Sequence, residues 1–136
     1  MRRLRRLILM ACLTIGLTAG ACAKDSLRPY TTNRSPVMNS LTIFPTDIGA
    51  ADSATITCLA SDQDGDTLVY DWDTDLRLRI KGNAPGDPTK SNTLSNMETF
   101  YPSFNPTRLE TVWVATSVRD RRGGSAVRII TFTIHP

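Results

Sequence analysis

Acidic residues of this chain gather around one short turn that could hold a metal ion. Asp62, Asp64 and Asp66 alternate in the stretch D-Q-D-G-D, and carboxylates on such a turn can converge on calcium, a hard cation that takes six to eight oxygen ligands. The stretch is not an EF-hand, because Gly65 is its fourth residue rather than its sixth and a strand-like run follows instead of a helix. Asp62, Asp64 and Asp66 are therefore candidate calcium ligands, and the sequence suggests no other cofactor.

The inventory of reactive side chains argues against an enzyme. The chain has one histidine, His135, which stands beside the last proline, so there is no histidine pair for zinc. A Ser-His-Asp or Cys-His arrangement would need this histidine to reach a nucleophile, and a glycine-rich phosphate loop is missing. Cys58 lies on the inward side of an alternating run, where a free cysteine acts as a small hydrophobic residue. We expect no catalytic site and a core position for Cys58.

The two tryptophans are expected to have different roles. Trp72 faces inward on the strand-like run after the cysteine, as a core tryptophan does in immunoglobulin-type sandwiches. Trp113 stands between Val112 and Val114, and it points outward if both valines face the core. An exposed tryptophan often marks a contact surface, here for a sugar ring or a partner protein. The alternative is that the 82–98 segment or the aromatic residues after it cover Trp113.

Alternation of apolar and polar residues predicts the strands that position these side chains. Period-2 runs are typical of strands with one buried face, and they cover residues 41–43, 53–60, 67–73, 76–80, 111–118 and 126–134. The last run keeps its period only if a bulge near Arg128–Ile130 shifts the phase, with Val127 inward before it. Asp-Gly and Gly-Gly mark the turns after the 53–60 run and before the last run. The 82–98 segment, rich in Gly, Pro, Ser and Asn, is expected to be a long loop.

The first residues have the features of an export signal. Four arginines within residues 1–6 precede a run of 13 residues, 7–19, which is too short for a membrane-spanning helix of about 20 residues. The A-G-A-C stretch ending at Cys22 resembles the lipobox of bacterial lipoproteins, with Ala19 where leucine is usual. The resemblance implies cleavage before Cys22 and lipidation of its thiol. Ordinary cleavage at a nearby A-x-A site is the alternative.

Removal of this segment would change the charge of the chain. The whole sequence has 16 basic and 13 acidic residues, a net charge of +3. Without the four arginines at the start, 12 basic residues stand against 13 acidic ones, so the mature chain would carry −1. The apparent basicity belongs to the targeting segment, and no nucleic-acid partner is expected. Cys58 would be the one cysteine without a role in processing, so no disulfide framework is expected.

The patterns divide the chain into three parts. Residues 1–21 are the predicted lipoprotein signal peptide. Residues 22–35 are polar and lack periodicity, as is typical of a flexible tether. Residues 36–136 remain for one domain, and about 100 residues suffice for a single hydrophobic core but not for two.

Two stretches of the predicted domain resemble a known family. The stretch C-L-A-S-D-Q-D-G-D-T-L-V-Y-D-W, residues 58–72, is similar to the second and third strands of bacterial PKD and cadherin-like domains. The stretch V-W-V-A-T-S-V-R-D-R-R-G-G-S-A, residues 112–126, is similar to their last hairpin. The resemblance implies an all-β, immunoglobulin-like antiparallel sandwich of about seven strands that serves adhesion, spacing or accessory binding. Some cadherin-like relatives bind calcium through acidic turns of this kind.

Such a sandwich also gives the aspartates of the acidic turn a second interpretation. In an immunoglobulin-like fold, the turn after the second strand and the last hairpin turn lie at the same end. The three aspartates would then lie near Arg119, Arg121 and Arg122, in an exposed network where each ion pair contributes about 0–1 kcal/mol. Nearby arginines would oppose calcium. Both interpretations stay open at the level of sequence.

The sequence thus predicts a non-enzymatic lipoprotein of the bacterial cell envelope, periplasmic or at the cell surface. Its sandwich is expected to act as a protein-interaction or spacer module, with a membrane contact through the lipid on Cys22 and an envelope protein or glycan as the other partner. Two alternatives are a carbohydrate-binding module that uses Trp113 and the 82–98 loop, and a calcium-dependent adhesion domain.

Overall fold

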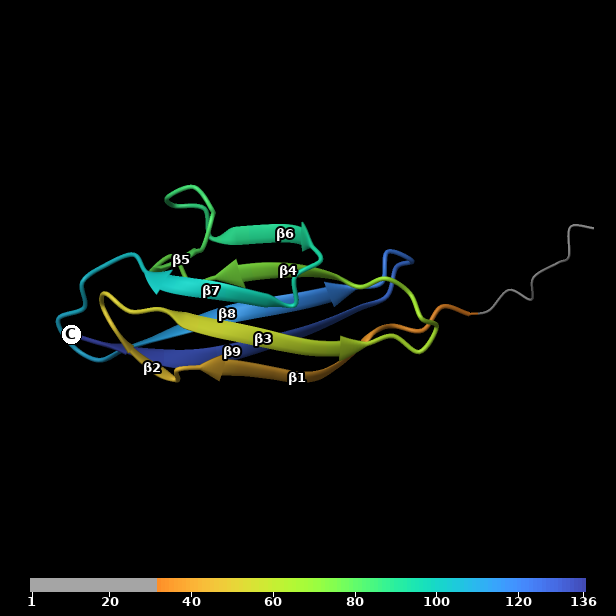
Figure 1. Ribbon diagram of the computed structural model, residues 1–136, viewed down its shortest axis with the longest axis horizontal. Helices are drawn as coiled ribbons and strands as arrows, with labels where there is room; N and C mark the ends of the chain where they lie inside the picture. Colours follow the sequence, from red (N-terminus) through yellow and green to blue (C-terminus); the bar gives the residue numbers. More distant parts are fainter. Residues whose placement is uncertain (1–31) are drawn as a thin grey trace, which may run out of the picture. The chain divides into compact units, whose positions relative to one another are not determined.

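A computed structural model describes the unit of the chain that runs from Thr32 to Pro136. This unit is a β-sandwich of nine strands in two sheets, without a helix (Figure 1). The predicted all-β, immunoglobulin-like fold class is therefore confirmed. The predicted signal peptide and Cys22 lie outside the described residues. Within residues 32–136, no helix long and apolar enough to span a membrane is present.

The first sheet has four antiparallel strands in the order β1-β3-β7-β5. Their bounds are Val37–Phe44 for β1, Ala54–Ser61 for β3, Met97–Pro102 for β7 and Leu78–Ile80 for β5. The second sheet has five strands in the order β2-β9-β8-β4-β6. Their bounds are Asp47–Gly49 for β2, Ser125–His135 for β9, Glu110–Arg119 for β8, Val69–Thr74 for β4 and Thr89–Thr93 for β6.

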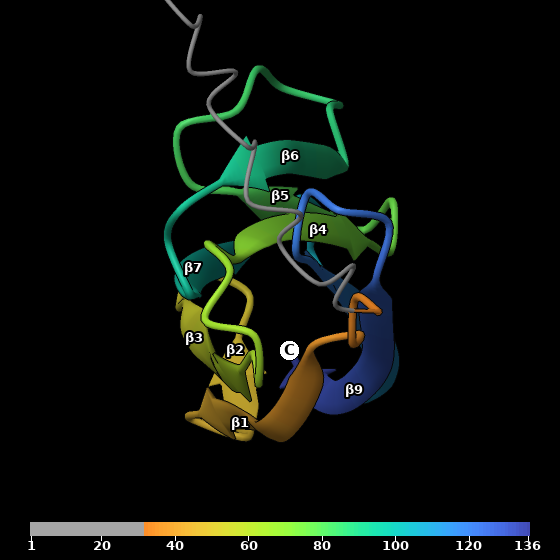
Figure 2. The same ribbon diagram turned by 90° about the vertical axis from the view of Figure 1, so that its right-hand side faces the viewer.

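The strand order matches the two sheets of immunoglobulin domains, with one sheet built around the second strand and the other around the third and the last hairpin. One pairing departs from the expected antiparallel pattern, because the short strand β2 runs parallel to the end of β9. Figure 2 shows β1 and β9 side by side at one edge of the sandwich. The two strands belong to different sheets, and β2 pairs with β9 only at Thr133–His135, so the earlier part of β9 has no strand paired with it on this side.

The sandwich has nine strands, two more than predicted, because short or polar segments also pair with their neighbours. The 82–98 segment was expected to be a loop, but residues 89–93 form β6 along the edge of β4. Strand β6 has the sequence T-K-S-N-T and no apolar face, so alternation gives no signal for it. Backbone pairing with β4 holds it in place, and Asn92 N–H also donates a hydrogen bond of 2.8 Å to Asp71.

The core lies between the two sheets and is built by the alternating residues of the predicted strands. Trp72 is 1% exposed and Phe100 is fully buried, with their ring centroids 6.0 Å apart in a tilted arrangement. Cys58 is fully buried in the same cluster. Burial accordingly raises the pKa of its thiol, with a smaller lowering effect from Arg128. The expected core positions of Trp72 and Cys58 are thus found in the structure.

The predicted bulge in the last strand is wrong. Strand β9 pairs with β8 in one unbroken register from Ser125 opposite Arg119 to Ile134 opposite Glu110. In this phase Arg128 takes an inward position opposite Thr116, and Val127 faces outward, 62% exposed. A charged residue is tolerated there because this part of β9 is a sheet edge, where a long side chain can reach water.

Two further side chains lie differently from their predicted positions. Alternation with the inward-facing Trp72 puts Val69 on the outer face of β4, yet it is 1% exposed. It lies opposite Arg119 of β8, whose side chain extends over the outer face of β4 to Asp71 and Asn92. Leu76 was expected in a strand, but it is 81% exposed in the turn before β5.

Candidate functional site

The acidic turn between β3 and β4 brings its three aspartates together. One carboxylate oxygen from each of Asp62, Asp64 and Asp66 lies within 4.8 Å of the others. Oδ1 of Asp62 accepts backbone hydrogen bonds from Asp64 at 2.8 Å and from Asp66 at 3.2 Å, which fixes the turn. Its other oxygen, Oδ2, is buried and accepts no hydrogen bond. The turn therefore holds oxygen ligands at a spacing that a cation could use.

The arginines reach this turn only in part. Arg122 pairs with Asp66 at 3.1 Å, as the ion-pair interpretation predicts. Arg119 instead pairs with Asp71 at 2.6 Å on the outer face of β4, so the prediction that it meets the acidic turn is wrong. Asp64 accepts a hydrogen bond of 2.7 Å from the backbone N–H of Arg34. One of the three aspartates is thus neutralised by an arginine side chain.

Residues 33–35 form a strap across the end of the sandwich, and Figure 1 shows this segment, in orange, beside the turn between β3 and β4. Asn33 donates a hydrogen bond of 2.7 Å to Oδ2 of Asp120, in the turn between β8 and β9. Ser35 packs so closely on Gly124 that a Cβ on that glycine would lie 2.7 Å from the Cα of Ser35. Residues 33–35 of the predicted tether thus contact the domain.

Asp120 organises this end of the sandwich. Its side chain is 2% exposed, and its Oδ1 accepts backbone hydrogen bonds from Arg122 at 2.7 Å and Gly124 at 2.9 Å. Burial alone would raise the pKa of Asp120, but the hydrogen bonds from Asn33 and from the two backbone groups outweigh it and lower the pKa. The carboxylate is therefore held ionised as the common partner of the strap and the turn.

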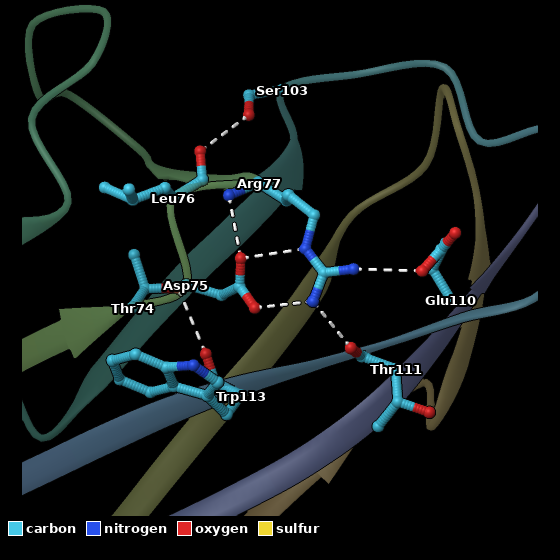
Figure 3. A network of polar contacts seen from close by, with 8 residues as sticks. All are labelled: Thr74, Asp75, Leu76, Arg77, Ser103, Glu110, Thr111 and Trp113. Carbon is cyan, nitrogen blue, oxygen red and sulfur yellow. Dashed lines mark hydrogen bonds and ion pairs between the residues drawn. The ribbon is translucent and has the colours of Figure 1, made fainter.

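A second polar network holds the other end of the sandwich together (Figure 3). Arg77, in the turn before β5, binds both oxygens of Asp75 at 3.0 and 2.7 Å. The same guanidinium donates to Glu110 at 3.0 Å and to the backbone carbonyl of Thr111 at 2.9 Å. The network ties the segment before β5, in the first sheet, to the start of β8 in the second. Its role in the structure is to join the two sheets.

This network makes stability depend on pH. Hydrogen bonds from Arg77 lower the pKa of Asp75 from its usual value of 3.8 in spite of partial burial. The unfolded chain then takes up protons at a higher pH than the folded domain does, so the free energy of unfolding falls as the pH drops through 3.8 toward the folded pKa. We expect Arg77→Gln to lower the free energy of unfolding at pH 7 by about 1 kcal/mol and to flatten this acid dependence.

Urea denaturation between pH 2.5 and 7 measures both effects. Arg108→Gln is the control, because the Arg108 side chain is 80% exposed and pairs with Glu110 alone. An equal acid dependence in the wild type and in Arg77→Gln would contradict the assignment of the lowered pKa to Arg77.

An apolar patch lies on the outer face of the second sheet, over β8 and β9. Trp113 is 37% exposed, Val127 62% and Ile129 66%. Ile129 is paired directly with Ala115 of β8, and Trp113 is one pair further along the same face. We call Trp113, Ala115, Val127 and Ile129 the β8–β9 patch. Alternation along β8 predicted the outward direction of Trp113, but the patch as a whole was missed because Val127 was assigned to the core.

The 82–98 segment, which was the predicted cover of Trp113, lies further from it within the sheet than β9 does. Strand β4 separates β8, which carries Trp113, from β6, which is part of the 82–98 segment. The turn of that segment is held internally, since Asn83 donates hydrogen bonds to the carbonyls of Asp87 and Thr89. Trp113 is therefore closer to the apolar residues of β9 than to β6.

Comparisons with known proteins give no relative for this chain: no family model matches it, and no curated protein or solved structure is detectably similar. The geometry of the described residues therefore carries the functional argument alone.

Proposed function

We propose that the chain is a lipoprotein of the bacterial cell envelope, anchored through Cys22, whose sandwich binds a partner protein through the β8–β9 patch. The observation that supports this binding role is the patch itself, in which Trp113, Val127 and Ile129 leave apolar surface exposed on adjacent strands. Exposed apolar surface costs free energy in water, and a contiguous patch of it marks an interaction site more often than scattered residues do. Tryptophan is also a frequent centre of binding energy in interfaces.

Cross-linking in the cell envelope tests the binding role. A photo-reactive amino acid at position 129 should give a cross-linked species of defined mass, and the same probe at position 59 should give none. Leu59 is a matched control because it is 53% exposed but lies on the first sheet. Ile129→Lys should abolish cross-linking from a probe at position 131. Equal cross-linking from positions 129 and 59, or none from either, would contradict the binding role and favour a spacer role for the domain.

The anchor requires a separate test. Cys22→Ser should abolish incorporation of labelled palmitate and move the protein from the membrane fraction to the soluble exported fraction. If labelling persists in this variant, the lipid is not on Cys22.

Retention on polysaccharides separates the proposal from the carbohydrate-binding alternative. Under that alternative, Trp113→Ala abolishes retention and Ile129→Lys leaves it unchanged, because a sugar ring stacks on the indole. Under the proposed function, wild type and both variants behave alike on the polysaccharide matrix, because neither substitution then removes a sugar contact.

Calcium-dependent adhesion is the second candidate, and the acidic turn favours it through the buried, unpartnered Oδ2 of Asp62 and the close spacing of the three carboxylates. A free calcium concentration 100-fold above the dissociation constant would add about 2.7 kcal/mol of stability, a rise of about 10 °C or more in Tm. A melt of the protein in millimolar calcium, with chelator as control, measures this. Asp62→Asn keeps Oδ1 for the turn and should lose the rise; an unchanged Tm in the wild type would exclude calcium.

A further inference from the structure

A shallow pocket of about 320 Å³ lies near the end of β7, away from the β8–β9 patch. Its lining consists of Ala50, Arg79, Pro102, Ser103, Phe104 and Asn105. The volume is at the lower end of the range for small-molecule sites and suits a ligand of about one sugar ring. The exposed surface of the pocket is mostly polar, and none of the six lining residues is acidic.

Arg79 is the one charged residue of this lining, and its side-chain N–H groups have no hydrogen-bond partner in the described part of the chain. Across residues 32–136, no acidic side chain lies within ion-pair distance of Arg79. Arg77, two residues earlier, is by contrast fully engaged with Asp75 and Glu110. Other basic side chains of residues 32–136, such as Lys81 and Arg121, also have no ion pair. Arg79 differs from them because it lines a pocket, where its free donors can meet a ligand.

The guanidinium of Arg79 is held in place without using its N–H groups. It lies 5.5 Å from the ring centroid of Tyr101, its cross-strand partner on β7. Stacking on an aromatic ring occupies the flat face of the guanidinium and leaves the donors at its edge available. Those donors match the two oxygens of a carboxylate, which arginine binds in a bidentate geometry. The pocket therefore has a positioned receptor for one carboxylate.

The segment opposite Arg79 is fixed and offers groups that recognise hydroxyls. Ser103 donates its backbone N–H to the carbonyl of Arg77 at 2.8 Å and its hydroxyl to the carbonyl of Leu76 at 3.2 Å. The hydroxyl oxygen can still accept a hydrogen bond. The amide side chain of Asn105 makes no hydrogen bond to any other part of the described chain, so it can both donate and accept. Ala50, Pro102 and Phe104 also line the pocket, but its exposed surface is mostly polar, which favours a ligand with hydroxyl groups over an apolar peptide side chain.

From these features we infer that the pocket around Arg79, Ser103 and Asn105 binds an acidic sugar, with the sugar carboxylate on the Arg79 guanidinium and ring hydroxyls on Ser103 and Asn105. This ligand site is independent of the β8–β9 patch and of the acidic turn. A shallow site with one charged contact predicts a dissociation constant in the millimolar range.

Titration of the full chain with glucuronate, followed by amide chemical shifts in the NMR spectrum, tests the inference. We expect shifts confined to residues near Arg79 and Ser103–Asn105, and affinity at least ten-fold higher for glucuronate than for glucose. Arg79→Gln should lower the affinity for glucuronate at least ten-fold. Arg79→Lys should lose most of it as well, because lysine keeps the charge but not the planar donor pair. Lys81→Gln is the matched control, since it removes a nearby charge outside the lining and should change the affinity less than two-fold.

Four results would overturn the inference. Equal affinity for glucuronate and glucose would remove the role of the carboxylate. Equal affinity for acetate and glucuronate would remove the role of the hydroxyls. A short peptide that binds through its free C-terminus more tightly than glucuronate would do the same. Unchanged binding in Arg79→Gln, with a wild-type melting curve that shows the variant is folded, would remove the site.

Discussion

Replacement of Trp72 by alanine should destabilise the domain by about 3–5 kcal/mol, the largest loss that we expect from any single substitution in this sandwich. The indole is 1% exposed and contacts Phe100 across the sandwich, at a centroid distance of 6.0 Å. Alanine would leave a cavity between two paired sheets that cannot collapse without breaking strand pairing. Because small domains are stable by only about 5–15 kcal/mol, we expect Tm to fall by about 15 °C or more.

The second tryptophan of the chain supplies the control. Trp113→Ala removes the same side chain from the outer face, where it is 37% exposed, and should cost about 1 kcal/mol. Trp72→Phe should lie between the two, since phenylalanine fills most of the space and removes an indole N–H that has no hydrogen-bond partner among the described residues. Similar losses for Trp72→Ala and Trp113→Ala, in matched thermal melts, would contradict the assigned core.

The second large effect is expected at Gly124, the last residue of the turn between β8 and β9, which packs against the strap. A Cβ there would collide with the carboxylate of Asp120 and with the backbone of Ser35. Gly124→Ala should therefore cost about 1–3 kcal/mol, the usual range for overpacking. Because the backbone of the strap must move to make room, the variant should also release Asn33 from Asp120.

Limited trypsin digestion reads out this release, because Arg34 is exposed and lies within the strap. We expect faster cleavage after Arg34 in Gly124→Ala and in Asn33→Ala, and an unchanged rate in Ser125→Ala. Ser125 is the next residue and is exposed. Lower stability of Gly124→Ala in urea without faster cleavage after Arg34 would mean that the strap does not depend on this contact.

How well the sequence predicts this fold depends on whether a strand has two neighbours. Strand β8 lies inside its sheet, and Val112, Val114 and Val118 are all buried as their alternation predicts. Strand β9 is an edge over part of its length, so Arg128 can occupy an inward position there. Alternation of apolar and polar residues therefore wrongly predicts a bulge near Arg128 and an inward Val127.

The candidate sites show the same division between local and tertiary information. Asp62, Asp64 and Asp66 are close in sequence, so their spacing already indicates that their carboxylates lie together. Whether an arginine reaches them depends on side-chain paths across the sheet, and Arg119 turns to Asp71 instead. The Arg79 pocket combines residues up to 55 positions apart, from Ala50 to Asn105. No spacing rule in the sequence connects such residues.

The strap over residues 33–35 also determines how the domain would bear mechanical load. Tension on the chain before Thr32 does not pass straight into β1, because Asn33 is held by Asp120 and Arg34 by Asp64. Asp64 lies between β3 and β4, which belong to different sheets, and Asp120 follows β8. A pull is therefore shared by both sheets at once. The strap is held by two hydrogen bonds, whereas β1 pairs with β3 along its length, so we expect the strap to yield under load before β1 separates from β3.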